Sequence, residues 1–330
     1  MNPFLFGVLL IVAAAICNSC FAIPLRHMRR WKWENMWLVF AIISLLVLPE
    51  ILVSGFVRGA AQLFQSVPLA DWAPALFFGF IWGIAQAGFG VAIRMLGIAV
   101  ALPVIGGMNI VLGALIPAIV QHPADLAGRP GVVLAGSSAL LLAGLASYSR
   151  AIRIRDCAAG TSTTVRGMLV CLLVGVTGGA NNIGFSLSAP IIHRAEALGN
   201  TSLTSTYPVW MVLLAGGFIP NLLYCGYLLR ANRTDRLYAA PGSGSDLLRA
   251  IGMAVLWTAA TFSYGIATQY AGKFGTSIGY LMYGSFTMIF ANVIGWKGGE
   301  WRGVSPLAVR LLWIGVIVML GSVCILGFTM

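Results

Sequence analysis

Ten long apolar runs constrain this chain more than any other feature. Each run has about 20 residues and few charges, which is what a helix needs to cross a hydrocarbon core of about 30 Å. The runs lie near residues 3–25, 35–57, 72–93, 97–120, 130–149, 167–190, 205–229, 250–272, 274–296 and 309–329. They are unbroken and lack the alternating polar pattern of a barrel strand. The sequence therefore predicts an all-α integral membrane protein with ten transmembrane helices.

The composition agrees with a chain that is surrounded by lipid. Hydrophobic residues make up 59% of the chain and charged residues 9%, and the mean hydropathy is +0.91. A soluble domain has about 25% charged residues. The six cysteines are scattered through or beside the apolar runs, so their spacing favours neither a disulfide framework nor a zinc site. We expect no metal and no cofactor.

The basic residues are distributed unevenly between the runs. The chain carries 20 Lys and Arg against 9 Asp and Glu, a net charge of +11. Sixteen of the basic residues fall in the odd-numbered connections, whereas each even-numbered connection has one: Arg58, Arg129, Arg194 and Lys273. Cytoplasmic loops are enriched in Lys and Arg, so we predict that the odd connections are cytoplasmic and both termini lie outside. Because the positive charge reports orientation, we expect no nucleic-acid binding.

Two segments 175 residues apart share one pattern of aromatic and small residues. In the first segment, Trp82 is followed by Ala85, Phe89, Gly90, Ala92 and Gly97. In the second segment, Trp257 is followed at the same spacing by Ala260, Tyr264, Gly265, Ala267 and Gly272. A repeat of this kind indicates a duplicated chain. Membrane proteins built from two related halves are mostly transporters, with the substrate between the halves.

Five runs per half is an odd number, so the second half must enter the membrane from the opposite face. The sequence thus predicts two inverted five-helix repeats related by a two-fold axis in the membrane plane. We place the first repeat at residues 1–150, a polar cytoplasmic linker at 151–166 and the second repeat at 167–330.

Three segments resemble a known family. Residues 29–37 read RRWKWENMW, residues 80–97 read FIWGIAQAGFGVAIRMLG and residues 297–301 read KGGEW. With the ten runs, they resemble the L-rhamnose/proton symporters of the drug/metabolite transporter superfamily, along nearly the whole chain. The resemblance implies a secondary transporter of the bacterial inner membrane. It would import a sugar (L-rhamnose or a related deoxy sugar, pentose or polyol) with protons, by alternating access.

Glu50 in the second run and the basic and aromatic residues 29–37 before it are interpreted separately. Glu50 lies inside the second run, about 6 Å beyond its midpoint, directly after Pro49. A carboxylate at that depth must face a cavity, pair or take up a proton, so Glu50 is our candidate for proton coupling; the alternative is an interfacial Glu whose carboxylate reaches outward. The aromatic and basic residues of 29–37 are predicted to anchor the chain at the cytoplasmic interface.

A sugar presents hydroxyl groups and an apolar ring face, so its site should combine amides or hydroxyls with an aromatic platform. Trp82, Gln86 and Gly90 share one helix face, and Trp257, Thr261 and Gly265 are their repeat counterparts. The candidate substrate-binding residues are Trp82, Gln86, Asn109, Asn181, Asn182, Trp257, Thr261, Tyr264 and Tyr283. For each amide the alternative is a hydrogen bond that joins two helices without touching substrate.

Other classes of function remain as alternatives to a sugar importer. A metabolite or drug exporter would share the architecture with a less polar cavity. An enzyme is disfavoured because no HExxH motif, nucleophile elbow or paired carboxylates occur. An ion channel is disfavoured because no filter motif occurs. The predicted partners are a sugar, protons and membrane lipid, and the sequence leaves the oligomeric state open.

Overall fold

The computed structural model describes residues 2–155 and 165–327, and all regular structure in these two ranges is helical. Ten helical stretches are long and apolar enough to span a membrane, which confirms the predicted number. The first five spans are α1 (Pro3–Cys20) with η1 (Ile23–His27), α2 (Trp33–Ile42) with η2 (Ile43–Val47) and α3 (Leu48–Phe56), α5 (Leu69–Leu96), α6 (Ile98–Gln121) and α7 (Arg129–Arg155). The last five are α8 (Val165–Gly178) with α9 (Ala180–Leu187) and α10 (Ala189–Ala197), α11 (Tyr207–Asn232), α12 (Ser243–Thr268), α13 (Gly275–Lys297) and α14 (Pro306–Gly327).

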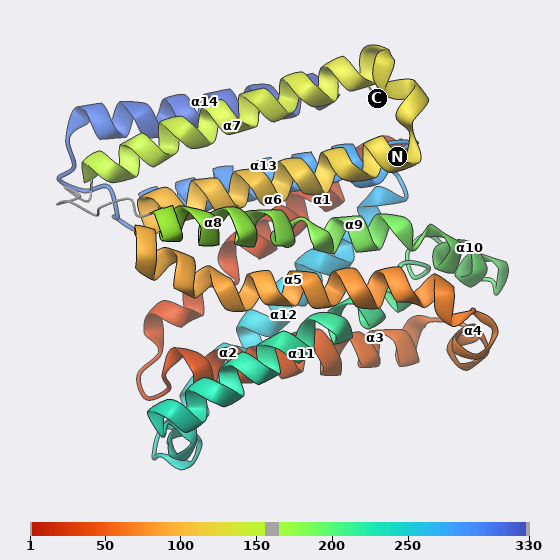
Figure 1. The fold of residues 1–330 in the computed structure, drawn as a ribbon, viewed down its shortest axis with the longest axis horizontal. Helices are drawn as coiled ribbons and strands as arrows, with labels where there is room; N and C mark the ends of the chain where they lie inside the picture. Colours follow the sequence, from red (N-terminus) through yellow and green to blue (C-terminus); the bar gives the residue numbers. More distant parts are fainter. Residues whose placement is uncertain (1, 156–164, 328–330) are drawn as a thin grey trace.

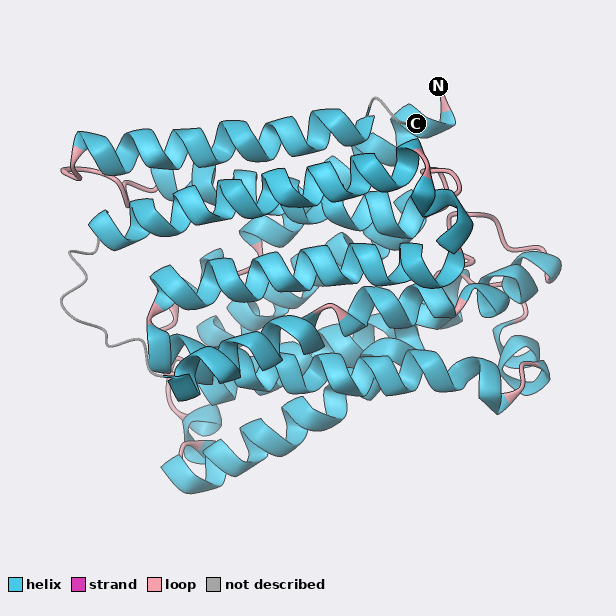
Figure 2. Cartoon of the chain, turned by 45° about the horizontal axis from the view of Figure 1, so that its top comes forward, coloured by secondary structure: helices cyan, strands magenta, loops and turns pink. Residues whose placement is uncertain are grey.

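The spans lie alongside one another in a single bundle, which Figures 1 and 2 show from two directions. The first turn of α1 and the last turn of α14 lie at the same end of the bundle, together with α10 and the short helix α4 (Ala60–Ser66) (Figure 1). We call this the terminus end. The α1–α2, α5–α6, α11–α12 and α13–α14 connections lie at the opposite end, which we call the basic end because the odd connections carry most of the Lys and Arg.

The second span is not a regular α-helix. Residues Ile43–Val47 form a π-helical turn in which the backbone N–H of Leu48 donates to the carbonyl of Ile43. Pro49 follows and has no N–H to donate, so the wider turn accommodates the missing bond without breaking the span. Glu50 therefore lies in the first turn of α3, directly after the irregularity.

The sixth span is broken twice, at Gly179 and at Ser188. At the first break the backbone lies against α6, since a Cβ on Gly179 would come 3.0 Å from the backbone nitrogen of Gly113 and 3.2 Å from the carbonyl oxygen of Asn109. A Cβ at this position would make α6 shift by a few tenths of an ångström, so glycine suits this close approach. The break starts α9 at Ala180 and so brings Asn181 and Asn182 to the centre of the bundle.

The helix contacts follow a paired pattern. From the first half, α5 and α6 pack against α8 of the second half; from the second half, α12 and α13 pack against α1 of the first half. Spans three and seven (α5 and α11) are in contact, and so are spans eight and two (α12 and α2). The fifth and tenth spans, α7 and α14, pack against each other. Each contact thus has a counterpart when the two halves are exchanged.

The predicted linker overlaps regular structure at its start. Helix α7 continues to Arg155, so residues 151–155 are helical, and α8 begins at Val165. The remaining part of the predicted linker, residues 156–164, lies outside the described residues.

A buried carboxylate joins the α1–α2 connection to α12 at the basic end. Asp246, in the first turn of α12, has no solvent exposure and accepts hydrogen bonds from the backbone nitrogens of Arg29 (3.2 Å), Arg30 (2.7 Å) and Trp31 (3.0 Å). It also accepts a bond of 2.7 Å from the guanidinium of Arg249. These donors compensate the cost of burying the charge. The α1–α2 connection is therefore held on the start of α12.

A second carboxylate, Glu34, reinforces the same junction. Its Oε1 accepts hydrogen bonds from Asn232 Nδ2 at 2.9 Å and Thr234 Oγ1 at 2.8 Å, in the α11–α12 connection. Trp31 is buried and packs edge-on against Tyr238, with ring centroids 5.2 Å apart. The interpretation of residues 29–37 as a lipid-interface anchor is therefore wrong for Trp31, because the ring packs on the second half of the chain.

We predict that Asp246→Asn destabilises the protein by about 2–4 kcal/mol, because an amide cannot accept the same set of bonds and its own N–H groups face donors. The free energy of unfolding in mixed micelles measures the effect. Asp235→Asn, at an exposed position in the connection that precedes α12, is the matched control and should change stability by less than about 0.5 kcal/mol. Equal effects of the two substitutions would show that the bonds to residues 29–31 contribute no stability.

Candidate functional site

A cavity of about 310 Å³ lies at the centre of the bundle. Its walls come from the first four spans of each half, whereas no lining residue belongs to α7 or α14. The lining includes Asn18, Phe21, Trp37, Trp82, Gln86, Phe89, Leu102, Asn109, Asn181, Trp210, Trp257, Thr261, Tyr264, Tyr280, Tyr283, Thr287 and Met288. The fifth and tenth spans thus pack beside the site without contributing to it.

The indoles of Trp82 and Trp257 are stacked at one side of the cavity. Their ring centroids are 5.7 Å apart and their planes are inclined by 18°. Trp82 belongs to α5 and Trp257 to α12, and the two occupy matching positions in the sequence repeat. Residues that correspond between two halves can touch only where the halves meet. The stacked pair therefore marks the junction of the two halves and gives the cavity a flat aromatic wall.

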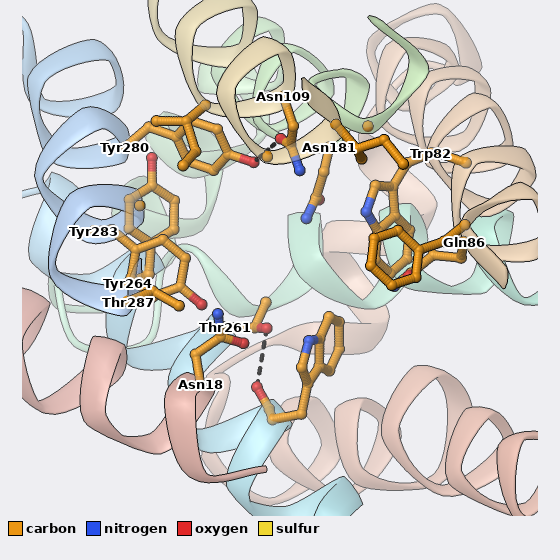
Figure 3. A pocket seen from close by; sticks show the side chains of 18 of the residues that line it. Asn18, Trp82, Gln86, Asn109, Asn181, Thr261, Tyr264, Tyr280, Tyr283 and Thr287 are labelled. Carbon is orange, nitrogen blue, oxygen red and sulfur yellow. Dashed lines mark hydrogen bonds between the residues drawn. The ribbon is translucent and has the colours of Figure 1, made fainter. Parts of the chain in front are cut away.

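Three tyrosines form another wall, apart from Trp82 and Gln86 (Figure 3). The ring of Tyr264 lies 5.1 Å from that of Tyr283 and 5.7 Å from that of Tyr280. Tyr280 donates a hydrogen bond of 2.8 Å to Asn109 Oδ1, which fixes the amide of Asn109 at the edge of the cavity. The Nδ2 of Asn109 points away from this bond, toward the open space (Figure 3).

Several polar groups in the lining have unused hydrogen-bonding capacity. Asn181 Oδ1 and Thr287 Oγ1 are buried and have no partner in the described structure. The side chains of Asn18 and Gln86 make no hydrogen bond to any described residue, and both face the cavity (Figure 3). Thr261 donates to the carbonyl of Trp257, one turn earlier, and its oxygen can still accept a bond. A ligand rich in hydroxyl groups would satisfy these groups, which are costly to leave unpaired in a membrane.

The cavity is electrically neutral. None of its described lining residues is Asp, Glu, His, Lys or Arg. The polar atoms are amides, hydroxyls and indole N–H groups, and these surround apolar surface from Phe89, Leu102 and Met288. Such a lining suits an uncharged polar molecule better than an ion.

Asn182 lies behind the cavity wall and does not line it. The side chain is fully buried; Nδ2 donates to the carbonyls of Gly113 (2.8 Å) and Thr276 (3.0 Å), and Oδ1 accepts from Tyr264 at 2.6 Å. These bonds join α9 to α6, α12 and α13. The amide is thus used within the protein, as in the helix-joining alternative that the sequence left open.

Beside Asn182, aromatic rings close the terminus end of the cavity. Phe185 stacks on Trp210 with ring centroids 4.5 Å apart, and Trp210, Tyr264 and Tyr280 are all buried. Toward the basic end, by contrast, the lining residues Phe89, Leu102 and Met288 are partly exposed. We call the group of Asn182, Tyr264, Phe185 and Trp210 the terminus-end seal.

Glu50 lies outside the cavity. Its side chain is exposed on α3, and its carboxylate accepts a hydrogen bond of 2.9 Å from Ser54 one turn later. Its role in proton coupling remains a prediction, and the cavity geometry gives it no direct contact with bound substrate.

The structure brings together most of the substrate-binding residues that the sequence singled out and adds others. Trp82, Gln86, Asn109, Asn181, Trp257, Thr261, Tyr264 and Tyr283 all line the cavity. Trp37, Tyr280 and Thr287 were missed. Tyr280, Tyr283 and Thr287 follow one another at helical spacing on α13, so this stripe was readable as a polar face. Trp37 could not be recognised in this way, because it lies among the aromatic and basic residues that were assigned to the membrane interface. In the structure it lines the cavity and donates a hydrogen bond of 2.8 Å to Asn221 Oδ1.

Comparison with known proteins gives a consistent result. The sequence model of the family described as L-rhamnose-proton symport protein (RhaT) matches residues 1–330. An L-rhamnose-proton symporter of Pectobacterium atrosepticum is 26% identical over 344 residues, covering 100% of this chain and 99% of the relative. One of Yersinia pestis is 25% identical over 341 residues, with the same coverage. A solved crystal structure matches 97% of this chain and 95% of its own with a TM-score of 0.60; at 15% identity it supports the fold alone.

We predict that Asn182→Leu opens the terminus-end seal, because it removes three hydrogen bonds that join four helices. A cysteine placed at Thr261, in a background without the native cysteines, should then react about tenfold faster with an impermeant thiol reagent added from the terminus end. Gln62→Leu, exposed in α4, is the control and should leave the rate unchanged. An unchanged rate in Asn182→Leu would mean that these bonds do not hold the seal closed.

Proposed function

The chain belongs to the L-rhamnose-proton symport protein family, and from this premise we propose that it imports L-rhamnose or a closely related sugar with protons, using the central cavity as the sugar site. It is a transporter and not an enzyme. The single observation that carries the assignment of the site is its lining: a neutral cavity at the junction of the halves combines stacked indoles with unpaired amides. Family membership also favours import over the exporter alternative.

The residue types of the cavity correspond to the two kinds of surface on a sugar. We assign the apolar ring face to the indole wall of Trp82 and Trp257. We assign the hydroxyl groups to Gln86, Asn109 and Asn181, whose amides can both donate and accept. A volume of about 310 Å³ is at the small end of ligand pockets, which range from about 300 to 1,000 Å³, and suits a single sugar ring.

We propose that the two halves, residues 1–150 and 167–330, form an inverted repeat. The paired pattern of helix contacts supports this arrangement, because exchanging the halves maps α5–α8 onto α12–α1 and α6–α8 onto α13–α1. The contact between Trp82 and Trp257, which match in the sequence repeat, supports a two-fold axis that passes through the cavity. The ten spans in two halves also support placement in the drug/metabolite transporter superfamily.

Alternating access follows if the two halves rock about this axis. With 16 of the 20 basic residues in the odd connections, we propose that the basic end faces the cytoplasm and the terminus end the periplasm, in the bacterial inner membrane. The seal at the terminus end and the partly exposed lining toward the basic end then correspond to a conformation closed to the periplasm. Inward movement of the sugar requires the bonds of Asn182 to break and form again in each cycle.

We predict that Trp82→Ala abolishes detectable L-rhamnose binding and that Gln86→Leu weakens it about threefold to tenfold, the effect of one lost hydrogen bond. Binding is measured as stabilisation of the purified protein by the sugar, since a ligand of the native state raises its stability. Gln65→Leu, exposed in α4, is the control and should bind as the wild type. Wild-type binding by both cavity variants would remove this cavity as the sugar site.

We predict that Glu50→Gln keeps L-rhamnose binding but lowers gradient-driven accumulation in vesicles to the level of passive equilibration, because an amide cannot take up a proton at this position. The variant would retain exchange of labelled for unlabelled sugar, which needs no net proton movement. If accumulation matches that of the wild type, Glu50 does not carry the coupled proton.

A further inference from the structure

A second cavity, of about 780 Å³, lies between α6, α7 and α8, and shares no residue with the central cavity. Its walls are Pro103, Val104 and Met108 of α6, Leu142, Leu145 and Ala146 of α7, and Leu172 of α8, and its mouth is bordered by Arg150 and Arg153. Leu142 is 45% exposed and Leu172 38% exposed, so the crevice opens on the side of the bundle. We call it the side crevice.

The side crevice exists because α7 packs mainly against α14. The two helices lie beside each other along one edge of the bundle (Figure 1). Their contact is close at Gly144, where an added Cβ would come 2.9 Å from the carbonyl of Gly315. The opposite face of α7 is therefore only partly covered by α6.

The length and depth of the side crevice match one leaflet of a bilayer. Leu142 is at the middle of α7, and Arg153 is near its end at the basic end of the bundle. The 11 residues between these positions span about 16 Å at 1.5 Å per residue. Half of a hydrocarbon core of about 30 Å is nearly the same distance. The apolar walls therefore run from the bilayer centre to the level of the headgroups.

The two arginines at the mouth are available to a ligand. Both side chains are exposed, and neither forms an ion pair with a described carboxylate. Arg155, on the same last turns of α7, is engaged elsewhere: it lies 3.6 Å from a carboxylate oxygen of Glu300 and over the ring of Trp301 at 5.0 Å. Arg150 and Arg153 thus leave unpaired positive charge at the mouth of the crevice, at the depth where lipid phosphates lie.

We propose that the side crevice binds an anionic phospholipid of the leaflet at the basic end. One acyl chain lies along the walls formed by Val104, Leu142 and Leu172, and the phosphate lies between Arg150 and Arg153. Two positive charges that pair with no carboxylate in residues 2–155 and 165–327 favour a lipid of net negative charge over a zwitterionic one. The bound lipid fills the space between α7 and α8, and so stabilises the packing of the fifth span on the rest of the bundle.

The test compares phosphatidylglycerol, phosphatidylcholine and inorganic phosphate as additives to the purified protein in detergent. Phosphatidylglycerol should raise the thermal stability of the wild type, and the other two should not. In Arg150→Gln/Arg153→Gln the lipid should bind about 30-fold more weakly, since each basic residue at an anionic headgroup contributes a factor of about five. Ala146→Phe keeps both charges but fills the crevice, and should lose the stabilisation as well.

Arg230→Gln/Arg233→Gln is the matched control. It removes two exposed arginines from the same end of the bundle, at the end of α11 and away from the crevice, and should respond to phosphatidylglycerol as the wild type does. Wild-type stabilisation of Arg150→Gln/Arg153→Gln would overturn the proposal. An equal loss in both arginine pairs, or stabilisation by phosphate alone, would also overturn it, because neither outcome depends on the crevice.

Discussion

The cost of an unpaired polar group in lipid determines how this structure is divided between frame and site. Polar residues with every group bonded hold helices together: Asn182 joins four helices, and Asp246 ties residues 29–31 to α12. Some polar groups without a partner, such as Asn181 Oδ1 and Thr287 Oγ1, line the central cavity, whereas others, such as Ser137 Oγ and Thr258 Oγ1, are buried outside it. Since hydrocarbon offers no hydrogen bonds, the unpaired groups in the cavity lining are those that a ligand can satisfy. The cavity and its unpaired groups together identify the site without reference to any substrate.

Positions that match in the repeated sequence pattern meet at the cavity. Trp82 and Trp257 occupy the same place in that pattern, and their rings stack at the cavity wall. Gln86 and Thr261 follow them at the same spacing, and both carry hydrogen-bonding side chains, but of different length. Under the proposed inverted repeat, a symmetrical frame carries an asymmetrical lining, as a chiral sugar requires.

The sequence predicted the spans well because hydropathy and the distribution of charge are local properties. It predicted Trp82, Gln86 and Asn181 as cavity residues because aromatic and amide side chains inside the spans match the two surfaces of a sugar, with helix-joining hydrogen bonds as the alternative for the amides. It could not separate Asn181 from Asn182, since adjacent residues on a helix point in directions that only the break at Gly179 fixes. It misassigned Trp31 and Trp37 because an aromatic-basic cluster has the same composition whether it meets lipid or the other half of the chain.

The neutrality of the cavity constrains how a proton can drive the sugar. No described lining residue has a carboxylate or imidazole, so sugar and proton do not share such a group there. A proton bound elsewhere can affect sugar affinity only by favouring one conformation of the two halves, and by reciprocity the sugar must then alter proton affinity by the same factor. The buried carboxylates Asp246 and Glu34 lie where connections from the two halves meet. In the rocking mechanism proposed above, energetic coupling between distant sites passes through the movement of the halves.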